Sequence, residues 1–199
     1  MTDFLSQSGI GNRIQAIRKQ HGIRSAKDLA AQVPGNSVTE AIVQNIEAGR
    51  KLDLSVSQLL NIANALRVSP IFLLTPIATP LAKLDIANLS PDFAGMTVVE
   101  FDAWISGEAE GAYAWATHAE RSERTQLEAM RDLHAQIRER RQLTTKLEAD
   151  HALTATAGNQ AAAHVRGVFD DRLHDVSERI RRLASYLDSA GWALEDTTE

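Results

Sequence analysis

The chain has 199 residues, of which 44% are hydrophobic and 24% are charged, a composition typical of a folded globular protein. It contains no cysteine, which excludes a disulfide framework, a thiolate metal site and a catalytic thiol. The first residues carry an acid where a secretory signal needs a basic region, and no stretch approaches the ~20 apolar residues of a membrane span. We therefore expect a cytoplasmic protein with no membrane partner.

Charge is distributed unevenly along the chain, whose net charge is −5. Residues 1–75 carry eight Lys and Arg against five Asp and Glu, whereas residues 76–111 carry one against six. Residues 112–199 carry twelve against fifteen. A basic first third in an acidic chain permits nucleic-acid binding in that third.

Residues 9–75 have the pattern of five short helices without strand alternation, which predicts a compact all-α domain. Helix starts and stops are marked by the usual residues: Ser25, Thr39 and Ser57 at starts, Gly22 and Gly49 at ends, and Ser69-Pro70 before a last turn over 71–74.

Residues 76–111 are expected to form an acidic linker, because three prolines interrupt helix formation and acids dominate. A capping box at Thr97 and Glu100 predicts one short helix within it, at about 98–106, whose aromatic residues pack on a neighbouring domain.

Residues 112–195 are expected to form two long helices, as a hairpin or a coiled coil. The second has apolar residues at alternating gaps of four and three, which is a heptad seam: Phe169, Leu173, Val176, Ile180, Leu183 and Leu187. The stripe on the first is thinner and is interrupted by Arg138 to Arg141. The sequence therefore favours homodimerisation through the seam. A monomeric hairpin, or two hairpins paired as a four-helix bundle, remain as alternatives.

The most specific pattern lies in residues 11–75. Its parts occur in a fixed order: Arg18, Leu29-Ala30, Ile46-Glu47-Ala48-Gly49, Ser57 to Leu60, and Ala65 to Pro70. Together they resemble the Cro and lambda-repressor-like (XRE-type) helix–turn–helix family. The resemblance implies a five-helix DNA-binding domain and a transcriptional regulator, more often a repressor, that binds double-stranded operator DNA. A phage or prophage immunity repressor is one identity that it allows.

The resemblance also implies which residues contact DNA. The family's base-reading positions fall on the helix at about 39–48, at Thr39, Glu40, Ala41, Gln44 and Asn45. Gln and Asn can bond an adenine edge, Glu can accept from cytosine, and an Ala methyl can touch a thymine methyl. The phosphate contacts expected are Lys27, Arg50, Lys51 and, as a weaker candidate, Arg13.

Arg18 and Glu47 stand where the resemblance implies an ion pair between the first and third helices. The chain departs from the family at two places. The turn before the third helix is three residues longer, and Ala26 stands where the family often has Gln.

Other classes of function are disfavoured by the sequence. It has no P-loop, dinucleotide fingerprint, nucleophile elbow or zincin motif, so we expect neither an enzyme nor a bound cofactor or metal. The alternative to a free-standing regulator is an antitoxin, whose C-terminal helices bind a toxin.

Overall fold

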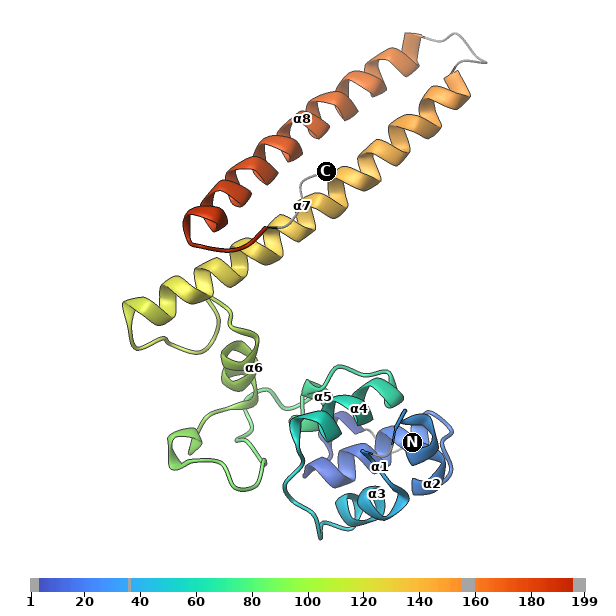
Figure 1. Ribbon diagram of the computed structural model, residues 1–199, viewed down its shortest axis with the longest axis vertical. Coiled ribbons are helices and arrows are strands. Elements are labelled where there is room, and N and C mark those ends of the chain that lie inside the picture. The colour runs from blue at the N-terminus through green and yellow to red at the C-terminus, as the bar shows by residue number, and fades with distance from the viewer. Residues whose placement is uncertain (1–3, 36, 155–159, 195–199) are drawn as a thin grey trace. The chain divides into compact units, whose positions relative to one another are not determined.

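The structure is a computed structural model that describes residues 4–35, 37–154 and 160–194 (Figure 1). Across these ranges it has eight α-helices, two 3₁₀ helices and no strand, with one isolated bridge between Lys83 and Thr97. The expected all-α class is confirmed for this part of the chain. None of the helices described is both long and apolar enough to cross a bilayer.

The chain divides into two compact units. The first comprises residues 1–106 with 111–113, and the second comprises 107–110 with 114–199. This division lies close to residue 112, where the long helices are expected to begin, and most of the expected linker, residues 76–111, belongs to the first unit.

Five short helices build the core of the first unit: α1 (Ile10–Gln20), α2 (Ala26–Gln32), α3 (Glu40–Glu47), α4 (Val56–Leu66) and α5 (Ile71–Leu74). Ser25 and Thr39 cap α2 and α3 as expected, whereas α4 is capped by Ser55 and not by Ser57. The core is formed by buried aliphatic side chains from all five helices, among them Ile14, Ile17, Leu29, Val43, Ile46, Ile62, Leu66 and Leu73.

The first part of the expected linker returns to these helices, since the N–H of Ala78 donates to the carbonyl of Leu5 and Asp85 accepts the N–H of Gly9. The backbone N–H groups of Val98 and Val99 donate to the carbonyls of Ala82 and Pro80, which pins α6 (Val98–Ser106) to the chain leaving α5. The aromatic residues of α6 pack within this segment, since the rings of Trp104 and Phe93 lie 5.2 Å apart in an edge contact. Several apolar side chains nearby stay exposed, including Leu81, Val99 and Ile105.

The second unit is a hairpin of α7 (His118–Thr154) and α8 (Gln160–Ser189), which lie side by side (Figure 1). The residues from Thr154 to Asn159 suggest a turn in the sequence, and this segment falls almost wholly outside the described residues. After α8 the chain folds back, and the indole Nε1 of Trp192 donates to Gln126 Oε1 on α7 at 2.8 Å.

The heptad seam of α8 packs on α7 of the same chain. Val176, Ile180 and Leu187 are buried, and Phe169, Leu173 and Leu183 are packed against the same cluster. Their partners on α7 include Ala129, Leu133, Ile137 and Leu143. The seam is thus occupied within the chain, in the hairpin that the sequence left as an alternative, which corrects its assignment as a dimer interface.

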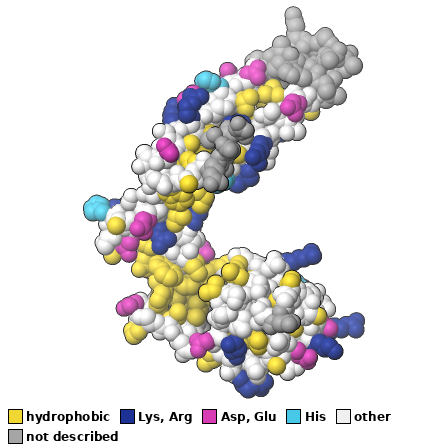
Figure 2. All heavy atoms as spheres, in the orientation of Figure 1, with side chains coloured by type: hydrophobic (Ala, Val, Ile, Leu, Met, Phe, Trp, Pro, Cys, Tyr) yellow, Lys and Arg dark blue, Asp and Glu magenta, His cyan; other side chains and the backbone are white. Residues whose placement is uncertain are grey.

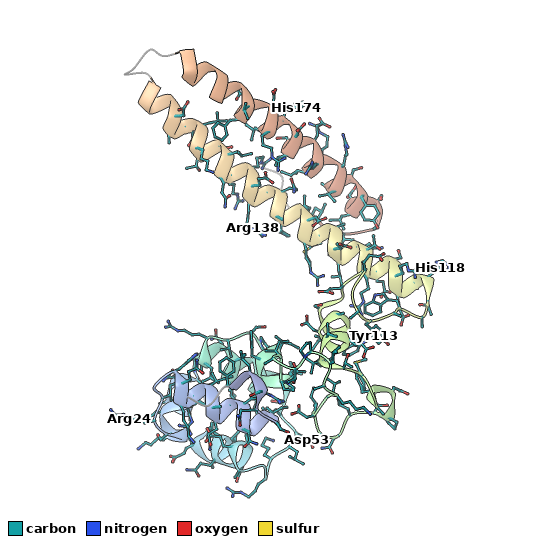
Figure 3. All side chains as sticks on the ribbon, turned by 180° about the vertical axis from the view of Figure 1, so that it is seen from behind. Arg24, Asp53, Tyr113, His118, Arg138 and His174 are labelled. Atoms are coloured by element: carbon teal, nitrogen blue, oxygen red, sulfur yellow. The ribbon has the colours of Figure 1, made fainter. Side chains whose placement is uncertain are left out.

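The arginine run of α7 does not break its apolar face, contrary to expectation. Helical periodicity turns Arg138 and Arg141 outward, and both are exposed. Figure 3 shows Arg138 on the side of α7 away from α8. Only Arg140 lies in line between Ile137 and Leu143, and it is half-buried.

Candidate nucleic-acid interface

Helix α3 offers one polar face to solvent and one apolar face to the core. Thr39 Oγ1 accepts the backbone N–H of Ile42 and so sets the start of the helix. Val43 and Ile46 are buried. Of the five expected base-reading residues, Thr39, Glu40, Ala41 and Gln44 are exposed and Asn45 is half-buried. The helix runs along an outer edge of the first unit (Figure 1).

The polar side chains of this face bond to one another. Gln44 Nε2 donates to Glu40 Oε1 at 3.0 Å, and Arg50 Nε donates to Asn45 Oδ1 at 2.9 Å. Both bonds are exposed to water, so they exchange for another partner at little net cost. The face therefore presents carboxylate, amide and methyl groups that suit hydrogen bonding to base edges.

Cations stand on α2 and in the loop that follows α3. Lys27 is exposed in the first turn of α2, and Arg50 is exposed in the loop that follows α3. Lys51, beside it, is half-buried. The backbone N–H groups of Arg50 and Lys51 both donate to the carbonyl of Asn45, which holds this loop at the end of α3. Figure 2 shows Lys and Arg side chains projecting from the first unit, with Asp and Glu between them.

Arg13 is not a phosphate contact, because its side chain is 0% exposed. All its donors are used internally. Nε and the two terminal nitrogens donate to the carbonyls of Leu73, Gln7 and Leu74 at 2.8–2.9 Å. The terminal nitrogens also bond both carboxylate oxygens of Asp85, at 2.7 and 2.9 Å. Arg13 is buried and joins three backbone carbonyls and one carboxylate. The sequence did not show this, because Arg13 looks like any other isolated basic residue.

Arg18 and Glu47 form the ion pair that the resemblance implies. Arg18 Nε and Nη2 donate to the two carboxylate oxygens at 2.7 and 2.8 Å, with the side chains 6% and 8% exposed. Arg18 Nη1 also donates to the carbonyls of Ile23 and Arg24. The hydrogen bond to Glu47 raises the pKa of Arg18 against the opposing effect of its burial. The pair ties the end of α3 to α1 and to the turn before α2.

A second close contact between α1 and α3, at Gly11, was not predicted from the sequence. A Cβ placed on Gly11 would stand 2.1 Å from the carbonyl oxygen of Ile46, so only glycine permits this approach of the two helices. The sequence signal was weak, because a glycine in the first turn of a helix lowers helix propensity without showing what lies against it.

No protein-family model matches the chain, and no curated protein or solved structure matches it either. Among the described residues, no group of three or more His, Asp or Glu side chains is arranged to hold a metal ion.

Proposed function

We propose that the chain is a sequence-specific DNA-binding transcriptional regulator that inserts α3 into the major groove. The observation that carries this proposal is the exposed face of α3, where Glu40, Gln44 and Asn45 stand together on a helix whose other face is locked to α1. A helix fits the major groove of B-DNA, and side chains near its start reach base edges.

Two features of the first unit support the proposal. Lys27 on α2 and Arg50 after α3 are exposed, as phosphate contacts need to be. The buried Arg18–Glu47 pair and the close approach at Gly11 fix the angle of α3 before DNA is met. A preorganised helix loses less conformational entropy on binding than a mobile one does. A regulator of this kind represses by covering the promoter, so repression is the mode we propose.

Homodimerisation belongs to the proposal as a prediction, since two-fold symmetry doubles the length of DNA that one short helix reads. Because the α8 seam is buried on α7, a dimer has to use another surface. The outer side of α8 is one such surface, where Tyr186 is exposed. Light-scattering mass of the full chain at tens of micromolar distinguishes a dimer from a monomer.

The test begins with selection of bound duplexes from a random pool by the full-length protein. Gln44→Ala and Asn45→Ala are expected to relax the selected sequence, each weakening operator binding by about 1–3 kcal/mol if the residue reads a base through two bonds. Lys27→Ala is expected to weaken all duplexes alike. Binding should also fall with salt, by a log–log slope of about −0.9 per phosphate neutralised.

Matched controls are available on other helices. Gln20 and Asn64 are exposed amides on α1 and α4, and neither belongs to α3. Gln20→Ala and Asn64→Ala should leave sequence preference unchanged. If all four variants select the same sequence as the parent, α3 is not the reading element. If no duplex is enriched, the chain does not read DNA.

A further inference from the structure

The segment after α5 returns to the start of α1 at Asp85. Asp85 Oδ2 accepts the backbone N–H of Gly9, the residue that precedes α1, at 2.5 Å. Both its oxygens pair with Arg13, as described above. Burial alone would raise the pKa of Asp85, but the hydrogen bonds from Arg13 and Gly9 and the guanidinium charge outweigh it, so the pKa is lowered. The carboxylate is therefore ionised at neutral pH and bridges two points of α1.

Three residues later the same segment reaches the loop between α3 and α4. Asn88 Nδ2 donates to Asp53 Oδ1 at 2.8 Å, and Figure 3 shows Asp53 at the edge of the helices that faces this segment. Asn88 has a φ of 58°, a left-handed conformation that Asn tolerates better than most residues. Ala87, between the two anchors, lines a surface pocket together with Asn12, Ile46, Lys51 and Leu52.

Residues 85–88 thus connect the first turn of α1 with the loop that carries Arg50 and Lys51. We propose that this segment, the 85–88 strap, positions that loop for its contact with the DNA backbone. The inference rests on the proposed function. It makes Asp85 and Asn88 positioning residues, although both are polar groups in a segment that carries a net negative charge and would by itself repel DNA.

The physical reason is the cost of ordering a loop. The first half of the loop is held by the end of α3, through the carbonyl of Asn45, and its last residue is held by the Ser55 cap of α4. In the middle of the loop, Asp53 is held by the hydrogen bond from Asn88, a residue that lies outside the loop. Without it the loop samples more conformations, and holding its cations against phosphates loses more entropy on binding.

Two variants of the full-length protein release the strap at its two ends. Asp85→Asn removes the charge that pairs with Arg13. Asn88→Gly removes the amide and keeps a residue that adopts the left-handed backbone. The matched control is Asp92→Asn, which removes one negative charge from the same segment at an exposed residue that bonds Ser90. Charge removal alone strengthens DNA binding slightly, and the control measures that effect.

The measurements are operator affinity and its salt dependence, at a temperature where circular dichroism shows each variant folded. Coupling of this kind amounts to about 2- to 30-fold in affinity, and we expect a weakening of that size for Asn88→Gly. The log–log salt slope should become shallower by up to about 0.9 for each phosphate that the loop no longer neutralises. A purely structural role would lower the melting temperature and leave the slope of the folded protein unchanged.

A double-mutant cycle of Asn88→Gly with Asp53→Ala isolates the bond between these residues. If the strap acts through it, the two effects are not additive and the second substitution adds little to the first. The inference is overturned if the parent binds its operator and both Asn88→Gly and Asp85→Asn, folded, bind with the affinity and salt slope of Asp92→Asn. Failure of the parent to bind any duplex instead removes the proposed function, and the inference with it.

Discussion

Different interactions stabilise the interior of each of the two units. In the first, two nearly inaccessible arginines, Arg13 at 0% and Arg18 at 5% exposure, each bind a carboxylate and two or more backbone carbonyls. In the second, an apolar seam repeats along two helices, and the described ion pairs lie at the surface, such as Arg172 with Glu139. Directional buried bonds admit one geometry, whereas a repeating seam tolerates small shifts of one helix along the other.

This difference fits the function proposed for the first unit. A helix that reads base edges has to be held to a fraction of an ångström, and its supporting bonds fix it in that way. We therefore expect a substitution at a buried arginine to disturb both the stability of the first unit and DNA binding, and one in the seam to disturb chiefly the stability of the hairpin.

The largest effect is expected from Arg18→Ala. Removing the guanidinium leaves the Glu47 carboxylate buried without its partner, and such a change destabilises by about 3–5 kcal/mol. Urea unfolding followed by circular dichroism measures the change, and operator binding should weaken as α3 loses its tie to α1. Lys19→Ala, at the exposed neighbour, is the control. Unchanged stability in Arg18→Ala would show that the pair is dispensable.

Ile180→Ala should have the next largest effect, in the second unit. Ile180 is 3% exposed, and truncation of a buried isoleucine costs about 2–5 kcal/mol. Val168→Ala on the same helix, at a residue 59% exposed, should cost well under about 1 kcal/mol. Because the seam is filled within the chain, the loss of stability in Ile180→Ala should be the same at every protein concentration. A loss that changes with concentration would mean that the seam pairs between chains.

The unfolding free energy of the first unit should depend on pH through Asp85. Its folded-state pKa is lowered, so it contributes stability above its unfolded pKa of about 3.9 and loses that contribution as pH falls through the folded value. The unfolding free energies of the parent and of Asp85→Asn should therefore differ by a constant amount above about pH 5 and converge below about pH 4. Parallel curves down to about pH 2 would contradict the paired carboxylate.

The sequence was informative where a signal was local or repeated. Caps at Ser25 and Thr39, the stop at Gly49 and the heptad of α8 depend on neighbours in the chain, and the structure agrees with them. The Arg18–Glu47 pair was predicted because the resemblance is specific by position. That the first unit binds DNA in a sequence-specific way stays a prediction.

What the sequence did not reveal depends on contacts between distant residues. Arg13 and Asp85 are 72 positions apart, and nothing in either neighbourhood marks them as partners. The acidic, proline-containing composition of residues 76–111 predicted a linker, because composition does not show that one carboxylate meets a buried guanidinium. The seam of α8 showed which face is buried but not which helix covers it. The charged run on α7 was counted as an interruption, although only Arg140 falls on the inner face.

The smallest effect is expected from Arg172→Ala, at the ion pair that is the hairpin's counterpart to Arg18–Glu47. Arg172 Nε and Nη2 both reach Glu139 Oε1, at 2.8 and 2.6 Å, but the side chains are 44% and 30% exposed. Water competes for both groups, and exposed pairs contribute about 0–1 kcal/mol. A double-mutant cycle with Glu139→Ala should give a coupling in that range, and about 1 M salt, with a Debye length of about 3 Å, should remove most of it.

The same cycle on Arg18 and Glu47 should keep its coupling at high salt, because buried charges are screened much less. If salt lowered the coupling energies of the two pairs equally, burial would not be what distinguishes the ion pair of the first unit from that of the hairpin.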